Sequence, residues 1–291
     1  MNKIRKFLSD TYKFFYYLKT YYKSGLIFEI HAAEHCNLHC KGCTHYSPIA
    51  EKEFCDLEVL EKSLKRLKDF QDICDHIHIL GGEPLLSPQI CDMMRLVRKY
   101  MDKTEIYILT NGILLLQPDK LPSDFWKTCR DNDIKIKVTQ YPVSLDYKKI
   151  EDVCRDNDVD FHIHYNRGNE GVGWRETLLS EQGGGCMEYK LKFFKLMKCQ
   201  RRCFQIVGDK IYPCTRPAYI RHLNKKFNTS FKVRKADYIE IDKLKSNFQL
   251  RKKFLFAIPF CNYCPPGTTQ TEWAHSKCEK SEWVRENKAK S

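Results

Sequence analysis

The sequence predicts an α/β fold in which short strands alternate with helices to form a parallel barrel, complete or partial. Two observations predict it. Five strand-like runs between residues 25 and 165 are separated by helical runs, and this alternation stops beyond residue 165, where glycines and then cysteines accumulate. Strands that alternate with helices form parallel βαβ units joined by right-handed crossovers, so five successive units fit a barrel better than a sandwich.

The predicted elements follow one another in a regular order along this core. After the first strand, Asp56 is a good cap for a helix whose leucines share one face. After the second strand, Ser87 and Pro88 are typical of a helix start. The expected strands cover residues 27–30, 76–80, 106–109, 134–138 and 159–164, and later helices are expected around Phe125 and Trp126 and through Ile150 and Val153.

The whole chain divides into four segments. These are a basic, aromatic N-terminal helix over 1–25, a barrel core with a glycine-rich connection over 26–186, a cysteine-rich module over 187–278 and a polar tail over 279–291. The N-terminal helix is suited either to contact with an anionic membrane or to covering one end of the domain, and we favour the second. The glycines of residues 166–186 indicate a mobile connection or lid, and the tail is expected to fray.

Composition narrows the function classes. Hydrophobic residues make up 42% and charged residues 30%, which excludes a disordered chain, and no apolar run reaches the roughly 18–20 residues of a membrane span. An excess of 50 Lys and Arg over 37 Asp and Glu favours an anionic partner or substrate, or simply a basic surface. Fifteen cysteines without a secretory signal predict a cytoplasmic protein with metal or redox chemistry.

The first chemical motif is a cysteine loop directly after the first strand. Cys36, Cys40 and Cys43 lie there within eight residues, at the strand end where barrel folds build active sites. With His39 or His45 as a fourth ligand, the three thiolates would form a zinc site. Alone, they would bind a four-iron cluster and leave one iron open for a small molecule. The cysteines by themselves leave both interpretations open.

Two glycine turns follow the next two strands. Gly81, Gly82 and Glu83 follow the second strand, and Asn111 lies in a Thr-Asn-Gly turn after the third. Paired glycines allow the backbone to approach a ligand, and Glu83 adds an acceptor suited to an ammonium group. Taken alone, the first turn could be no more than a tight strand-to-helix connection. Three such motifs after three successive strands form a much more specific pattern.

This combination of motifs resembles the radical S-adenosylmethionine (radical SAM) superfamily over about residues 25–165. The resemblance implies a partial (β/α)6 TIM-like barrel and a [4Fe–4S] cluster whose open iron binds the amino and carboxylate groups of SAM. One position departs from the usual pattern, because Gly42 replaces the aromatic residue that normally precedes the third cysteine. By resemblance, the cluster ligands are Cys36, Cys40 and Cys43, and the residues that contact SAM are Gly81, Gly82, Glu83, Asn111 and Gln140.

The C-terminal cysteines resemble the SPASM or shorter twitch modules of the same superfamily. Those modules bind auxiliary iron–sulfur clusters through a Cys, a hairpin that ends in Cys and a later CxxC. Gly208 and Asp209 separate two strand-like runs and predict such a hairpin. We expect one [4Fe–4S] cluster here, the second of the chain, and a zinc ribbon is the alternative. Its four ligands would be drawn from Cys199, Cys203, Cys214, Cys261 and Cys264.

The resemblance also implies a reaction. An electron from a flavodoxin- or ferredoxin-type donor would reach the cluster, SAM would be cleaved, and a 5′-deoxyadenosyl radical would take a hydrogen atom from the substrate. An auxiliary cluster that accepts an electron makes the enzyme an oxidoreductase. We expect a sugar-like or carrier-linked small-molecule substrate, with peptide or protein modification as the alternative. The sequence assigns no catalytic residue.

Two further patterns, the paired histidines and the basic charge combined with many cysteines, each allow more than one interpretation. His76 and His78 point the same way on one strand, as do His162 and His164 on another, so each pair could serve as acid–base or metal groups, or be ordinary half-buried residues. A non-catalytic zinc protein that binds nucleic acid would explain the charge and the cysteines. It would not explain the βα units or the glycine turns, so nucleic acid is not an expected partner.

Overall fold

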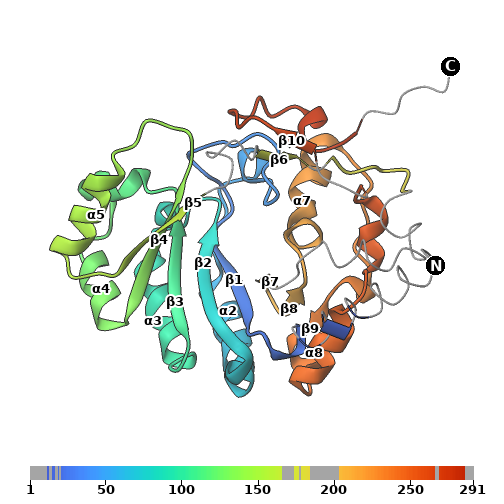
Figure 1. Cartoon of the computed structure of the whole chain (residues 1–291), viewed down its shortest axis with the longest axis horizontal. Helices are drawn as coiled ribbons and strands as arrows, with labels where there is room; N and C mark the ends of the chain where they lie inside the picture. The colour runs from blue at the N-terminus through green and yellow to red at the C-terminus, as the bar shows by residue number, and fades with distance from the viewer. Residues whose placement is uncertain are drawn as a thin grey trace.

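One eight-stranded sheet forms the centre of the computed structural model, which describes residues 12, 15, 16, 19, 21–165, 174–176, 178–183, 203–265 and 269–285 (Figure 1). Its strand order is β5-β4-β3-β2-β1-β7-β8-β9. The strands are β1 (Leu26–Ala33), β2 (Cys74–Gly81), β3 (Glu105–Thr110), β4 (Ile134–Gln140), β5 (Phe161–Tyr165), β7 (Cys203–Val207), β8 (Lys210–Tyr212) and β9 (Ile239–Glu240).

The predicted partial barrel is confirmed. The six neighbouring strands β5, β4, β3, β2, β1 and β7 run parallel to one another. Strands β8 and β9 add an antiparallel edge beside β7. The sheet does not close, because β5 and β9 remain its two edges. The sixth parallel strand, β7, comes from the cysteine-rich part of the chain and pairs with β1, so the expected hairpin extends the barrel sheet itself.

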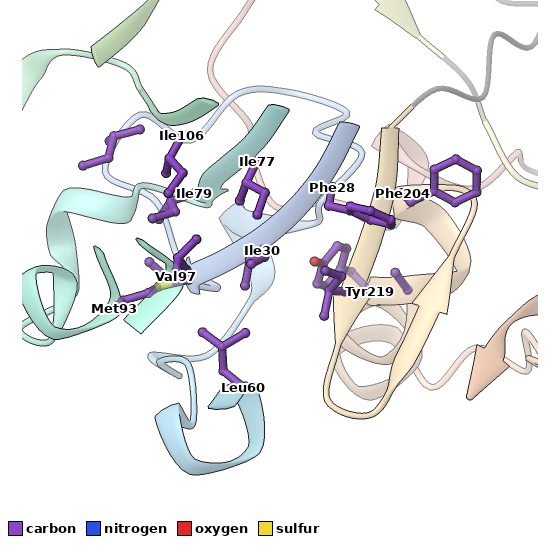
Figure 2. Close-up of a cluster of buried hydrophobic side chains, with 14 of the residues drawn as sticks. Phe28, Ile30, Leu60, Ile77, Ile79, Met93, Val97, Ile106, Phe204 and Tyr219 are labelled. Carbon is purple, nitrogen blue, oxygen red and sulfur yellow. The ribbon is translucent and has the colours of Figure 1, made fainter. Parts of the chain in front are cut away.

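Helices cover the outer face of the parallel strands (Figure 1). Side chains from two of these helices, Leu60, Met93 and Val97, pack beside strand residues such as Ile30 and Ile77 (Figure 2). The inner face carries the alternate, mostly polar residues of each strand. The helices are α2 (Leu57–Leu67), α3 (Ile90–Tyr100), α4 (Phe125–Asp131), α5 (Tyr147–Asp156), α7 (Thr215–Phe227) and α8 (Asn247–Phe254).

Helix starts agree with the sequence in one case and differ in another. Asp56 caps α2 as predicted, since its carboxylate accepts hydrogen bonds from the backbone N–H groups of Glu58 and Val59. The prediction that Ser87 and Pro88 begin the next helix is wrong, because α3 begins at Ile90. The Ser87 hydroxyl accepts a bond from the Gln89 N–H and so closes a turn ahead of the helix.

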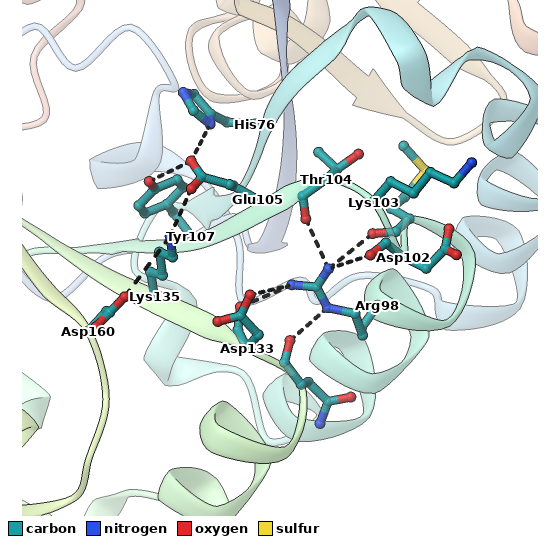
Figure 3. Close-up of polar contacts among 12 residues, drawn as sticks. His76, Arg98, Asp102, Lys103, Thr104, Glu105, Tyr107, Asp133, Lys135 and Asp160 are labelled. Carbon is teal, nitrogen blue, oxygen red and sulfur yellow. Dashed lines mark hydrogen bonds and ion pairs between the residues drawn. The ribbon is translucent and has the colours of Figure 1, made fainter.

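Arg98 joins three parts of the outer layer at the end of α3 (Figure 3). Its guanidinium donates to the carbonyls of Thr104, Asn132 and Asp133 at 2.9, 2.7 and 3.0 Å. The first carbonyl precedes β3, and the other two lie between α4 and β4. One partly buried guanidinium therefore fixes how two successive βα units approach each other.

The expected fraying of the tail is wrong for residues 279–285. Trp283 is only 3% exposed, and the backbone of Leu179 bonds to both Trp283 and Arg285, at 2.7 and 2.8 Å. Residues 178–183 are therefore pinned to the C-terminal segment, contrary to the predicted mobile connection. A short ribbon of β6 (Trp174–Glu176) with β10 (Thr269–Thr271) joins the same two regions. The other residues of 166–186 lie outside the described part of the chain.

The N-terminal segment packs against α8. Helical residues end at Lys23, and Tyr21 is buried with its hydroxyl bonded to the Arg251 carbonyl at 3.0 Å. The Arg251 guanidinium in turn donates to the carbonyls of Tyr21 and Ser24. This arrangement agrees with a helix that covers one end of the domain. None of the helices in the described ranges is long and apolar enough to span a membrane.

Candidate active site

A cavity of about 260 Å³ lies at the carboxyl ends of β1 to β4. This is the end of a parallel sheet where loops from successive strands meet. The cavity is lined by all three cysteines of the first loop and by residues from the turns after β2, β3 and β4. The predicted residues along it are Cys36, Cys40, Cys43, Gly81, Gly82 and Asn111; others are Glu29, Thr44, His45, Leu80, Thr139 and Tyr141.

The cysteine loop is held at its start by Asn111 and at its middle by the C-terminal segment. The Asn111 amide donates to Asn37 Oδ1 at 2.7 Å and lies 3.8 Å from Cys36 Sγ. Cys40 forms an antiparallel β-bridge with His275. Beside it, the Lys41 N–H donates to the Ala274 carbonyl at 2.9 Å, and the Ser276 N–H donates to the His39 carbonyl at 2.7 Å. A segment more than two hundred residues away therefore fixes the backbone of a predicted cluster ligand.

The same C-terminal segment reaches the third cysteine. The indole Nε1 of Trp283 donates to the Cys43 carbonyl at 2.9 Å. That carbonyl also accepts from the Tyr46 N–H at 3.0 Å, so the end of the loop is fixed from two directions. Sequence reasoning missed this role of Trp283, because one tryptophan in a polar tail gives no periodic signal.

The two glycines after β2 allow two strand ends to approach closely. A Cβ on Gly81 would lie 2.2 Å from the Ala33 carbonyl oxygen, and one on Gly82 would lie 2.0 Å from that of His35. Gly81 also has a φ of +139°, which side chains disfavour. The Gly82 N–H bonds to the Ala33 carbonyl at 2.8 Å. The glycines thus lock the turn after β2 against the start of the cysteine loop.

Glu83 does not line the cavity. Its side chain is 0% exposed and accepts hydrogen bonds from the Leu85 N–H, the Thr110 hydroxyl and the Asn111 N–H, at 3.2, 2.6 and 2.9 Å. Burial raises the pKa of this carboxyl to about 7, although the three donors counteract the rise. Glu83 therefore joins the turns after β2 and β3, and the cavity wall beside it is glycine backbone.

Gln140 lies on the other side of β4 from the cavity. Its neighbours Thr139 and Tyr141 line the cavity, whereas Gln140 is absent from the lining. Side chains alternate along a strand, so Thr139 and Gln140 point to opposite faces. The structure offers Thr139 and Tyr141 in place of the residue that the sequence suggested.

The three thiols suit an iron–sulfur cluster in their chemistry and placement. Burial raises the pKa of Cys36 and of Cys40 to about 12, so both need a bound cation to become thiolates. The buried Nε1 of Trp273 lowers the pKa of Cys40 and makes no hydrogen bond of good geometry with described residues. It is a ready donor to the Cys40 sulfur. Within the described ranges, no three His, Cys, Asp or Glu side chains could together hold a single metal ion, whereas each cysteine of a four-iron cluster binds a different iron.

The histidines proposed as zinc ligands have other surroundings. His39 is exposed, and its carbonyl accepts from the Ser276 N–H. His45 lines the cavity, where its Nδ1 lies 2.9 Å from His31 Nε2, and burial lowers its pKa to about 4. The buried network continues through Glu34, whose Oε2 lies 3.1 Å from His31 Nδ1 and 3.0 Å from His222 Nε2. His45 therefore belongs to a hydrogen-bonded network that braces the loop.

The second cysteine set lies beside the first. Tyr46 follows the first loop and is 1% exposed; burial raises its pKa, and Cys264 and Cys214 contribute to the rise. Its hydroxyl is buried and forms no hydrogen bond with a described residue. Cys261 and Cys264 share one turn, in which the Cys264 N–H bonds to the Cys261 carbonyl at 3.2 Å. Thiols of both sets, Cys43 of the first and Cys214 and Cys264 of the second, therefore act on Tyr46.

Cys199 and Cys203 are the two candidates for the first ligand of the second cluster, and of these two only Cys203 lies in the described part of the chain. The hairpin pairing ends at Gln205 and Tyr212. Cys203 begins β7, and Cys214 lies two residues beyond β8, directly before α7. Cys199 lies outside the described residues.

Comparison with known proteins identifies the class. Residues 30–136 match the family model described as "Radical SAM superfamily", and they run from within β1 into β4. This part of the chain is a radical SAM domain, and proteins of that superfamily use a [4Fe–4S] cluster and SAM. The matched region contains the cysteine loop, both glycine turns and most of the cavity wall.

Particular relatives match over shorter or more divergent stretches. The bovine (Bos taurus) molybdenum cofactor biosynthesis protein 1 is 33% identical over 87 residues, 30% of this chain and 14% of that protein. GTP 3′,8-cyclase of Peptoclostridium acidaminophilum is 32% identical over 87 residues, 30% of this chain and 27% of that enzyme. The chain therefore spans less than a third of either relative.

Two solved structures are similar to the chain at lower sequence identity. BtrN in complex with AdoMet and 2-DOIA gives a TM-score of 0.47 at 16% identity, over 83% of this chain and 93% of that one. Streptococcus suis SuiB bound to S-adenosylmethionine gives a TM-score of 0.37 at 15% identity, over 97% of this chain and 81% of that one.

Proposed function

We propose that this radical SAM protein is an enzyme that cleaves SAM reductively and oxidises or otherwise modifies a sugar-like or carrier-linked small molecule. The observation that carries the proposal is the shared cavity, where three cysteines of one loop meet the Gly81 and Gly82 backbone and Asn111. Cys36, Cys40 and Cys43 would hold the cluster. When bound, the cluster and SAM supply a radical that removes a hydrogen atom from the substrate.

The chain's own residues would position these groups and exclude water. Gly81 and Gly82 present backbone polar atoms without side chains, which suits an amino group of SAM. Asn111 fixes Cys36 and Asn37 and keeps its side chain at the same wall. Tyr141 and Trp273 have ring centroids 6.4 Å apart and are the aromatic residues we propose for the adenine, where Gly42 offers no ring.

A second four-iron cluster is part of the proposal. Its proposed ligands are Cys203, Cys214, Cys261 and Cys264, with Cys199 as the alternative to Cys203. Cys214 and Cys264 act on Tyr46, which directly follows the first loop, and a cluster near that loop suits an electron acceptor. A flavodoxin- or ferredoxin-type protein would be the electron donor, and the net charge of +13 favours such an acidic partner.

The direct test measures 5′-deoxyadenosine formed by reduced, reconstituted protein with SAM. The wild type should form it, and Cys40→Ala should lose at least a hundredfold of the rate, because two thiolates cannot retain the cluster. Cys55→Ala is the matched control, since Cys55 is a partly buried thiol outside the cavity, and it should keep the wild-type rate. Wild-type rates in Cys40→Ala, or a colourless zinc-containing wild type, would refute the proposal.

A further inference from the structure

Three polar side chains form a row on the inner face of the sheet, one of them lines the cavity, and the cofactor assignment uses none of them. Glu29 lines the cavity from β1, and the sheet register places His78 of β2 and Gln205 of β7 directly beside it on either side. Because directly paired residues of adjacent strands share a face, all three point into the barrel. They are 9%, 6% and 0% exposed.

These three side chains are incompletely satisfied. The Gln205 amide donates to one Glu29 oxygen, and His78 Nδ1 lies 3.6 Å from the other. Both His78 ring nitrogens and Gln205 Oε1 are buried and form no hydrogen bond with a described residue. Buried polar groups without partners cost stability, so several of them in one row indicate a place for a ligand.

The charge of the row specifies what kind of ligand fits. Burial alone would raise the pKa of Glu29, but His78, His45 and Gln205 outweigh it and hold the pKa below its usual value. Burial lowers the pKa of His78 despite the nearby Glu29, so the imidazole is neutral near pH 7. No Lys or Arg in the described ranges forms an ion pair with Glu29. Glu29 is thus an anion that accepts a hydrogen bond from the neutral Gln205 amide and, within the described ranges, has no Lys or Arg partner.

We propose that Glu29, His78 and Gln205 bind the hydroxyl or ammonium groups of a polyhydroxylated, sugar-sized substrate. Such a ligand donates to the Glu29 carboxylate and also offers groups to His78 and Gln205, which flank it on strands about 4.8 Å apart. A phosphate in direct contact with Glu29 is disfavoured by the carboxylate, although Lys137 of β4 acts on His78 from the same inner face. The inference rests on the proposed function and names the substrate class of the same site.

The test measures binding of three probes, myo-inositol, glucosamine and galactose, to anaerobically reconstituted protein with SAM, by saturation-transfer NMR. At least one probe should bind the wild type, and Glu29→Gln should weaken it at least tenfold, because the neutral amide loses the charge-assisted bond. Glu105→Gln is the matched control. Glu105 is another carboxylate on the inner face, but it is paired with Lys135 and lies outside the cavity, so binding should stay within twofold.

Three outcomes would overturn the inference. Either none of the probes binds the wild type, or Glu29→Gln binds them as the wild type does. Loss of iron or of SAM affinity in Glu29→Gln would also overturn it, by assigning Glu29 to the cofactor site. Because 5′-deoxyadenosine formation is measured in the same preparations, failure of the proposed function is seen separately as a wild type that cannot cleave SAM.

Discussion

At the residue scale, Glu83 shows how one buried carboxylate organises a site without facing it. It receives three hydrogen bonds from the turns after β2 and β3, and one of the donors is the Asn111 N–H. The Asn111 side chain then reaches Asn37 in the cysteine loop. Glu83 therefore acts on the cavity through Asn111, as a positioning residue.

We expect Glu83→Ala to destabilise the protein even without any cofactor. Three buried donors would lose their acceptor, at a cost of about 1–3 kcal/mol for each that water cannot reach. Urea unfolding of cluster-free protein should show a loss of roughly 2–4 kcal/mol. Glu51→Ala is the control, because this glutamate is exposed, and it should unfold like the wild type. Unchanged stability of Glu83→Ala together with weaker SAM binding would make Glu83 a direct ligand instead.

The cysteines and glycines of the site were predictable as residues, but their contacts were not. Spacing after successive strands is local information, and it identified Cys36, Cys40, Cys43 and the glycine turn. Whether Gly81 approaches a ligand or Ala33 depends on the packing of two strand ends, which no spacing encodes. Trp273 and Trp283 reach the loop from a distant segment, and single aromatic residues carry no pattern that would reveal this.

At the scale of elements, the Arg98 fork connects α3 to the backbone before β3 and before β4 (Figure 3). Those strands carry Asn111 and Thr139 to the cavity at their far ends. The α2 start was predictable from Asp56, because a capping side chain acts on its own neighbours. The Arg98 contacts were not, because they join carbonyls that are adjacent only after the strands have paired.

We expect Arg98→Lys to lower the free energy of unfolding by about 2 kcal/mol. A lysine keeps the charge but cannot reach carbonyls on both sides, and hydrogen bonds from charged groups contribute about 1.5–3 kcal/mol each. The matched control is Arg95→Lys, one turn away, whose side chain is 46% exposed and pairs with Asp92 and Asp124. It should change stability by less than about 1 kcal/mol, and an equal effect of both changes would contradict the role of the fork.

At the scale of the whole molecule, chain segments far apart in sequence converge on one end of the barrel. The C-terminal segment bonds to the cysteine loop at Cys40 and Cys43, and β7 extends the sheet beside β1. The βα alternation predicted the barrel, since each unit is read locally. It could not predict that the hairpin joins the same sheet, because that pairing spans more than 170 residues.

This arrangement predicts two clusters with separable ligands. Fully reconstituted wild type should contain about eight irons per chain, and Cys261→Ala with Cys264→Ala about four, because the first loop closes on its own cysteines. Cys203→Ala should lose iron as the double variant does, whereas Cys199→Ala should keep all of it. Iron and acid-labile sulfide analysis provides the measurement. Four irons in the wild type with zinc at the second set would refute the second cluster alone.

The central claim is that the first loop holds a four-iron cluster with one iron open to SAM. Electron paramagnetic resonance of the reduced Cys261→Ala, Cys264→Ala protein tests it most directly, because only the first cluster contributes to the signal. We expect a four-iron signal that changes when SAM is added and that disappears when Cys40→Ala is introduced. A signal that is the same with and without SAM would contradict it.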